Sequence, residues 1–242
     1  IIEPLGGYVM VGWEPRVFTQ KTVLQAIIDG DEDSTIRKFA EGAKEYGKPV
    51  FLRWGHEMNG NWYSWSGEDN GKNPDLYIQA WRHIHDLMVK EVGATNIIWV
   101  WCPNAYSVPN ESWNSIDKYY PGDEYVDWVA VDFYGLMKGW GRTDPGPALD
   151  QVYKLYGERK PVMIGESAAA DPDSSDASFG LSKPQWIDLW FDAIEARPKV
   201  RAAVWFNIDK EADWRVQSDS ESLATYRQRL SDEGYLGQPY TK

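Results

Sequence analysis

Two glutamates in this sequence follow apolar runs that are typical of buried β-strands. Glu57 follows the run VFLRWGH, and Glu166 follows the run PVMIG. On strict alternation Arg53 and Gly55 share a face with Glu57, so Gly55 would leave room between that carboxyl group and the Arg53 guanidinium. Because the carboxyl ends of parallel strands meet at one edge of a sheet, the two glutamates can converge there.

Two convergent carboxyl groups can cleave a glycosidic bond. One protonates the leaving oxygen, while the other attacks the anomeric carbon or activates water. A separation of about 5 to 5.5 Å gives retention of configuration, and a wider one gives inversion. The nucleophile must be ionised, so a guanidinium such as that of Arg53 should lower its pKa. A strand-terminal glutamate can equally be a helix cap or half of a loop ion pair, so the pair alone leaves these interpretations open.

The elements that must position these glutamates alternate along the chain. Short apolar, β-branched or aromatic runs alternate with segments of helical period, which predicts βα units and a parallel sheet. The predicted strands are residues 7–13, 49–56, 96–102, 126–133, 161–166 and 200–207. Segments rich in Gly, Pro, Asp and Ser follow strand ends at 65–72, 136–147 and 168–183. Long loops at that end build the active face of α/β barrels.

Helix signals separate the strands. Asp33 or Ser34 can cap a helix that Gly47 ends, and its apolar stripe is Ile36, Phe39, Ala40, Ala43 and Tyr46. Asn73 and Pro74 open a second helix, with Gly93 just beyond its end. Further helices are predicted at 148–156, 184–196 and 221–230.

Composition narrows the range of partners. A net charge of -12 repels phosphate backbones and anionic lipid surfaces, so we expect neither nucleic acid nor membrane partners. The 14 Trp residues include more indoles than a core usually needs, and indole faces stack on sugars. We expect about two-thirds of them to be core packing, from the usual burial of Trp. Cys102 is alone, so neither an intrachain disulfide nor a thiolate metal cluster can form.

Several stretches resemble one enzyme family. The run HEMNG at 56–60, followed by Trp62 and Trp65, resembles the acid/base segment of glycoside hydrolase family 26, within the clan of retaining (β/α)8 glycosidases. NIIWVWCPN at 96–104, YPGDEYVDWVAVDFYG at 120–135 and KPVMIGE at 160–166 agree with it in order and spacing. The resemblance covers nearly the whole chain, and the His-Glu-Met-Asn motif is its most specific part.

The resemblance implies an α/β fold of the (β/α)8 TIM barrel type and a double-displacement mechanism. Glu57 would be the acid/base at the end of strand four and Glu166 the nucleophile at the end of strand seven. His56 and Tyr134 would contact the sugar or the nucleophile, and Trp205 would form a platform beneath the sugar. The remaining candidates for substrate binding are Arg53, Trp62, Trp65, Trp101, Asn104 and Arg215.

The sequence departs from this family at its start. Counted back from strands four and seven, the run at 7–13 is strand three, so the first two βα units of the barrel are missing from the front. We expect residues 1–242 to be one catalytic domain, trimmed or shortened at its N-terminal end. Substrate contacts from the first two strands cannot be assigned.

Other chemistries fit poorly. A zinc protease needs a second His four residues after His56, and position 60 is Gly. His83 and His85 are two apart on a helix, so they make no shared ligand pair and fit a solvated surface better. No Gly-rich phosphate loop or nucleophile elbow is present, and the acidic clusters 29–33 and 171–176 do not match an EF-hand. We therefore expect no metal and no cofactor.

The resemblance predicts a retaining endo-β-glycanase that acts as a monomer on a β-linked polysaccharide. β-1,4-Mannan is the first choice and mixed-linkage β-1,3-1,4-glucan the second, because mannose and glucose differ only at the C2 hydroxyl, which ~1 to 3 kcal/mol of polar contacts must discriminate. A polymeric substrate implies a secreted protein, although the start of the chain shows no signal sequence. The rival from another class is a non-catalytic carbohydrate-binding protein.

Overall fold

The computed structural model describes residues 7–16, 21–139, 141–171 and 177–232. It consists of two compact units, Ile1–Ala130 and Val131–Lys242, and each is described by itself. The prediction of one catalytic domain over residues 1–242 stays a prediction.

The first unit is built on parallel strands. β1 (Val9–Trp13) pairs with β2 (Val50–Trp54), and β2 pairs with β3 (Ile97–Trp101). β4 (Trp128–Gly135) begins beside β3 in the same parallel sense. Every residue of β2 and β3 is buried, as expected of parallel strands covered on both faces. The prediction of strands in these four places is confirmed.

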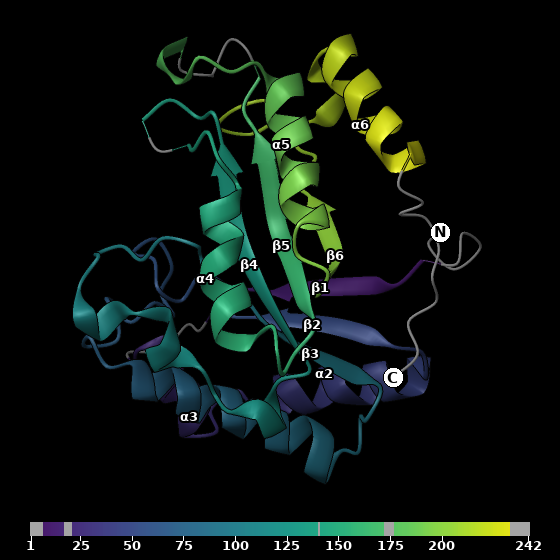
Figure 1. Ribbon diagram of the computed structural model, residues 1–242. Coiled ribbons are helices and arrows are strands. Elements are labelled where there is room, and N and C mark those ends of the chain that lie inside the picture. Colours follow the sequence, from purple (N-terminus) through teal and green to yellow (C-terminus); the bar gives the residue numbers. More distant parts are fainter. Residues whose placement is uncertain (1–6, 17–20, 140, 172–176, 233–242) are drawn as a thin grey trace. The chain divides into compact units, whose positions relative to one another are not determined.

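Three helices accompany these strands. In Figure 1, α2 (Asp33–Tyr46) and α3 (Pro74–His85) lie on one side of the strands. A π-helical turn, Asp86–Glu91, continues α3. A short helix, α1 (Val23–Ile28), packs against α3 and was not predicted, since its six residues carry no side-chain cap.

The helix ends test the capping predictions. Gly47 ends α2 in the left-handed conformation, and Asn73 accepts the N–H of Asp75 at the start of α3, both as predicted. The predicted cap of α2 is wrong, because the helix begins at Asp33 after Glu32, which makes no side-chain cap. Tyr46 is exposed, so the apolar stripe of α2 ends earlier than predicted.

In the second unit helices alternate with the remaining strands. α4 (Gly146–Tyr156) follows β4, and β5 (Val162–Ala169) runs beside β4 in the same direction (Figure 1). α5 (Lys183–Glu195) leads to β6 (Val200–Trp205), which pairs with β5 in parallel, and α6 (Ser220–Asp232) packs on α5. Short 3-10 turns occur in both units. Those of the first unit are Ser112–Asn114, Ile116–Tyr119 and Asp123–Tyr125, and those of the second are Ala177–Phe179 and Val216–Ser218.

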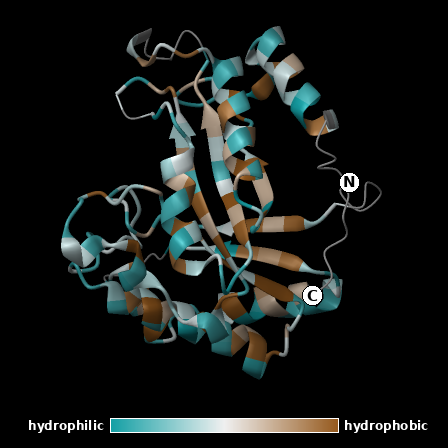
Figure 2. Cartoon of the chain, viewed as in Figure 1, coloured by the Kyte–Doolittle hydropathy of each residue, from teal (hydrophilic) through white to brown (hydrophobic). Residues whose placement is uncertain are grey.

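The strands carry the apolar core of each unit. Figure 2 shows them largely in hydrophobic colours, whereas the helices carry hydrophilic residues along much of their length. The buried tryptophans are Trp54, Trp65, Trp81, Trp99, Trp101, Trp128, Trp186, Trp190 and Trp214. Nine of the 14 Trp residues of the sequence are therefore seen to be buried among the described residues, which exclude Trp140, close to the predicted two-thirds.

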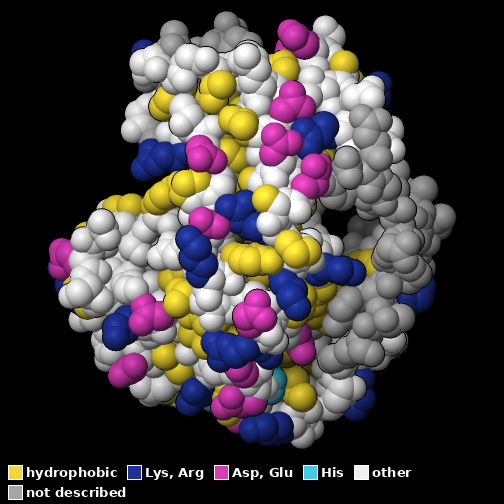
Figure 3. Space-filling view, in the orientation of Figure 1, with side chains coloured by type: hydrophobic (Ala, Val, Ile, Leu, Met, Phe, Trp, Pro, Cys, Tyr) yellow, Lys and Arg dark blue, Asp and Glu magenta, His cyan; other side chains and the backbone are white. Residues whose placement is uncertain are grey.

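The surface in view in Figure 3 mixes acidic and basic side chains. Asp29 and Asp31 both pair with Lys21, as expected of solvated loop charge, whereas residues 172–176 of the second acidic cluster lie outside the described residues. His83 pairs with Asp33, but the expected solvated position of His85 is wrong because its ring packs on Trp99 and Tyr125. Among the described residues no helix has the length and apolarity needed to cross a bilayer.

Candidate active site

Glu57 lies just beyond β2, where the backbone leaves the extended conformation. The strand ends at Trp54, and both Gly55 and Glu57 have φ near 54°. The predicted strand reached His56, so the expected alternation does not extend to Glu57. A non-glycine residue in the left-handed region costs about 1 to 3 kcal/mol, and such strain gathers at functional sites. The backbone N–H of Glu57 donates to the carbonyl of Cys102 at 2.8 Å, which ties it to the end of β3.

The close packing at Gly55 has a different cause from the one expected. A Cβ at this position would lie 3.2 Å from the Tyr77 ring and 3.6 Å from Trp65. Gly55 therefore admits two aromatic rings, rather than leaving room between Glu57 and Arg53.

The Glu57 side chain is only 7% exposed, and both carboxyl oxygens accept hydrogen bonds. Nε1 of Trp62 donates to Oε2 at 2.8 Å, and Nδ2 of Asn104 donates to Oε1 at 2.7 Å. Donors of this kind stabilise the ionised carboxylate. The Trp62 ring itself is 45% exposed, so an indole bonded to a buried carboxylate also presents a surface to solvent.

Asn59 fixes the orientation of Asn104. Its Oδ1 accepts the backbone N–H of Asn104 at 2.9 Å, and its Nδ2 donates to the Asn104 carbonyl at 2.8 Å. Oδ1 of Asn104 is taken by the N–H of Tyr106 at 2.9 Å, which leaves the amide N–H groups to face Glu57. Asn59 is fully buried and was not selected from the sequence, although it belongs to the HEMNG run.

His56 is buried beside this carboxylate, with its ring against Tyr63 and Trp65. Burial lowers the pKa of His56 to about 3, the positive charge of Arg53 adds to that shift, and Glu14 opposes it. Nδ1 of His56 has no hydrogen-bond partner among the described residues. The imidazole is therefore neutral over the range in which most enzymes work.

Three other predicted residues of the first unit are buried. Nε1 of Trp65 donates to the carbonyl of His56 at 2.8 Å. The Trp101 ring packs edge-on against Tyr120, and an Arg53 nitrogen lies 4.0 Å from Sγ of Cys102. None of them is exposed enough for a sugar ring to lie on it. Of the three, Trp65 contacts His56 directly, through its hydrogen bond and its ring.

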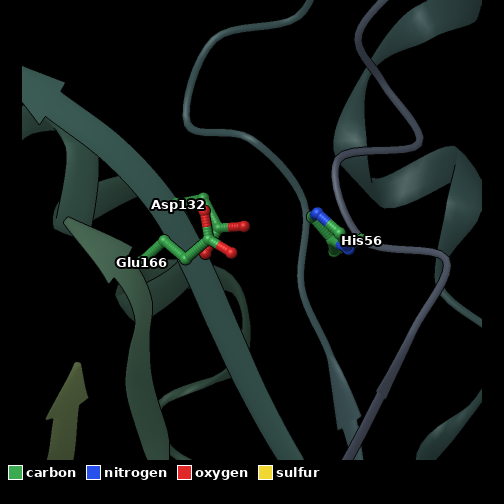
Figure 4. A group of neighbouring side chains, drawn as sticks. All are labelled: His56, Asp132 and Glu166. Atoms are coloured by element: carbon green, nitrogen blue, oxygen red, sulfur yellow. The ribbon is translucent and has the colours of Figure 1, made fainter. Parts of the chain in front are cut away.

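Glu166 lies inside β5, which continues to Ala169, three residues further than predicted. The Tyr134 hydroxyl donates to Oε2 of Glu166 at 2.7 Å. A carboxyl oxygen of Asp132 lies within 4.8 Å of one of Glu166, and Figure 4 shows these two groups side by side on β4 and β5. Asp132 is fully buried and was not selected, although an acid within an apolar strand was a usable signal. His56, also labelled in Figure 4, belongs to the first unit.

The two remaining candidates are Trp205, the last residue of β6, and Arg215, on the segment that follows. The Trp205 ring packs against Trp186, Trp190 and Tyr226, and its Nε1 donates to the Trp214 carbonyl at 2.8 Å. The Tyr134 ring is contacted instead by Phe206 and Trp214.

Arg215 forms a bidentate pair with Asp213, and this hydrogen-bonded carboxylate raises the pKa of Arg215 while the guanidinium lowers that of Asp213. The guanidinium remains partly exposed.

Comparison with known proteins gives a consistent result. The sequence model of a family described as glycosyl hydrolase family 26 matches residues 19–217. Endoglucanase H of Acetivibrio thermocellus is 38% identical over 235 residues, which are 93% of this chain and 24% of that protein. Mannan endo-1,4-beta-mannosidase A and B of Caldalkalibacillus mannanilyticus is 33% identical over 152 residues, which are 60% of this chain and 27% of that protein. The chain thus spans about a quarter of the length of these relatives.

Solved structures show the same fold. The catalytic domain of an endo-β-1,4-mannanase from a Bacillus species matches with a TM-score of 0.76 at 20% identity, over 98% of this chain and 68% of that one. A Cellulomonas fimi endo-β-1,4-mannanase double mutant matches with a TM-score of 0.73 at 19% identity, over 96% of this chain and 55% of that one. Together with the alternating strands and helices, this likeness places the chain in the α/β barrel class. The numbering of its strands as three to eight stays a prediction.

Proposed function

The chain belongs to glycosyl hydrolase family 26, as its sequence motifs predicted, and from that premise we propose that it hydrolyses internal linkages of a β-linked polysaccharide. The observation that carries this proposal is the setting of Glu57. A buried carboxylate on a left-handed residue receives one donor from an exposed indole and one from a fixed amide. Such a carboxyl group suits proton transfer to and from a sugar oxygen bound against that indole.

We assign the two steps to two glutamates. In the first step Glu57 gives a proton to the glycosidic oxygen while a Glu166 oxygen bonds to the anomeric carbon and the leaving sugar departs. In the second step Glu57 takes a proton from water, whose oxygen displaces Glu166 with a second inversion. The hydroxyl of Tyr134 supports Glu166 as the nucleophile, because its hydrogen bond holds one carboxyl oxygen in place.

The donors on Glu57 fit both steps. The Trp62 and Asn104 N–H groups donate to the two oxygens of the carboxylate that acts as the base in the second step. In the first step the exposed Trp62 indole turns its N–H toward the bound sugar and releases Oε2 for a proton. Trp62 therefore contacts substrate in this proposal, whereas Trp65 and Trp101 are buried and do not.

A β-glucan is the better supported substrate. The relative that is 38% identical over 93% of this chain is named an endoglucanase, whereas the mannan-named relative matches 60% of it at 33%. Each matched part is about a quarter of its protein, so neither name says which part acts on which polysaccharide. β-1,4-Mannan, the first choice from sequence, therefore becomes the second candidate. A polymer substrate also supports action outside the cytoplasm.

A substrate panel tests the proposal. We expect the wild-type chain to release oligosaccharides from lichenan or mannan, with little action on xylan or carboxymethylcellulose. Glu57→Ala and Glu166→Ala should each lose at least about 10³-fold in kcat/KM. Proton NMR of the first product formed should show the β-anomer, because two inversions give retention. An α-anomer as the first product contradicts double displacement.

The same panel addresses the rival function. A chain that binds these polysaccharides in affinity electrophoresis but hydrolyses none of them is a carbohydrate-binding protein. External azide gives the complementary check, since it should restore turnover of an activated aryl glycoside by Glu57→Ala as a β-glycosyl azide. Glu57→Gln serves as the matched variant, because it keeps the shape and one acceptor oxygen but has no titrating proton.

A further inference from the structure

Lys183 is a buried lysine that the sequence did not single out. It is the first residue of α5 and is only 2% exposed. Its Nζ donates to the carbonyls of Asp213 and Arg215 at 3.3 and 2.8 Å, and to Oγ of Ser218 at 2.9 Å. An ammonium has three N–H donors, so these acceptors match its full capacity.

Lys183 is not needed to start the helix. Ser182 and Gln185 already form a reciprocal capping box at this end of α5. A cation in the first turn also opposes the helix dipole. Burial lowers the pKa of Lys183 to about 8, with a further lowering by Arg215, and Asp213, Asp219 and Asp171 oppose the shift. A lysine placed at such a cost is better explained by what it holds.

The segment that Lys183 holds carries Trp214. This fully buried residue lies between the two carbonyls bound by Nζ. Its N–H donates to the carbonyl of Ile208 at 2.9 Å, and its own carbonyl accepts Nε1 of Trp205 at 2.8 Å. The backbone on both sides of Trp214 is therefore fixed, and Lys183 supplies the contacts from α5.

Trp214 connects this segment to the proposed nucleophile. Its ring centroid lies 4.9 Å from that of Tyr134, tilted by 51°. The Tyr134 hydroxyl in turn donates to Glu166 at 2.7 Å. Because the hydroxyl oxygen is rigidly attached to the ring, the position of the packed ring decides where the hydroxyl lies.

We propose that Lys183 is a positioning residue for glycoside hydrolysis, which holds Trp214 against Tyr134 and thereby keeps the Tyr134 hydroxyl on Glu166. The inference rests on the proposed function and adds to it a residue that touches neither the sugar nor Glu166. Its loss acts on the nucleophile, so the chemical step suffers more than substrate binding.

A double-mutant cycle tests whether Lys183 acts through Tyr134. The single variants are Lys183→Met, which keeps chain length without donors, and Tyr134→Phe, which removes the hydroxyl. We expect each to lower kcat by about 10-fold or more with KM changed by less than about 3-fold. The double variant should be no more than about 2-fold worse than Tyr134→Phe, because the hydroxyl is already gone. If the double variant instead shows the product of the two single fold-losses in kcat, the inference is overturned.

Arg197→Met is the matched control. Arg197 is another partly buried cation next to α5, and it binds Asp150 and the carbonyl of Gly146 instead of the Trp214 segment. Its loss should lower the melting temperature. Any fold-change that it causes in kcat should multiply with the fold-change caused by Tyr134→Phe. Equal coupling of Arg197→Met and Lys183→Met to Tyr134→Phe shows a general loss of stability and overturns the inference.

Two further results keep the inference separate from folding and from the proposed function. If Lys183→Met does not fold, Ser218→Ala removes one acceptor of the same ammonium, and its smaller loss, about 2- to 5-fold, should vanish in the Tyr134→Phe background. Persistence of that loss overturns the inference. A wild-type chain that hydrolyses nothing overturns the function and the inference together, whereas an active chain with independent effects overturns the inference alone.

Discussion

The indole nitrogen of Trp62 donates to Oε2 of Glu57 at 2.8 Å, although the two residues stand five apart on an irregular loop. One side chain thus combines an exposed ring with a donor to a buried carboxylate. These two properties can be separated by substitution.

Trp62→Phe keeps the ring and removes the donor. With the donor lost, the indole no longer holds Oε2 of Glu57, so we expect kcat to fall by less than about 10-fold while KM changes little. Trp62→Ala should in addition raise KM because the sugar loses its stacking surface. A kcat of Trp62→Phe equal to that of the wild type contradicts the role of the indole as a donor.

Asn59→Ala should impair both stability and activity. The substitution removes the bonds that join Asn59 to the Asn104 backbone and leaves buried groups unsatisfied, at a cost of about 2 to 4 kcal/mol. We expect kcat to fall about 10-fold or more as Asn104 leaves Glu57. Asn96→Ala is the control, since its amide joins the carbonyls of Ala43 and Lys48, which precede β2, whereas Glu57 follows its other end. That variant should unfold at lower urea with kcat nearly unchanged.

The position of Glu57 should show a reversed preference for glycine. Its φ of 54° is left-handed, so the free energy of unfolding of Glu57→Gly should exceed that of Glu57→Ala by about 1 kcal/mol. Both variants should be inactive. At Glu45, inside α2, the order should invert by a similar amount, because alanine is the better helix former. Urea unfolding of the four variants measures both differences. The same order at both positions contradicts left-handed strain at Glu57.

His56 should make the protein less stable in acid. The pKa of His56 is lowered from 6.5 to about 3, so the unfolded chain takes up a proton before the folded one does. The contribution of neutral His56 to the free energy of unfolding is then fully present above about pH 6.5 and is lost as the pH is lowered toward 3. His56→Leu should lose less stability than wild type between pH 7.5 and pH 4.5 in thermal unfolding. Parallel losses in the two proteins would rule out His56 as a source of acid lability.

Local periodicity predicted most of the elements. Tyr77, Ala80, Trp81 and Ile84 recur at helical spacing, and all four are buried in α3. The six strands were found from short apolar runs, and β2 to β5 are buried on both faces, which leaves a continuous apolar signature. The short helix Val23–Ile28 was missed because it has fewer than two helical turns and no side-chain cap. The end of β2 was misplaced because Gly55 and Glu57 leave the extended conformation.

The roles of the aromatic residues could not be predicted in the same way. Trp62 and Trp65 stand three apart in one loop, yet the first is exposed and the second fully buried against Tyr63. Trp205, which was expected beneath the sugar, is partly buried and packs on α5 and α6, while Trp214 reaches Tyr134. An irregular loop has no fixed period, so composition indicates a site there without saying which ring faces it.

The sequence by itself determined the family, the alternation of strands and helices, and the two glutamates as candidates for the chemistry. These follow from local patterns and from motifs read along the chain. The tertiary structure decided which groups hold each carboxylate, since Asn104 reaches Glu57 across 47 residues and Tyr134 reaches Glu166 across 32. It also decided that the buried Lys183 bonds the carbonyls on both sides of Trp214. Hydrogen bonds between distant residues depend on how loops pack, and no local periodicity records that.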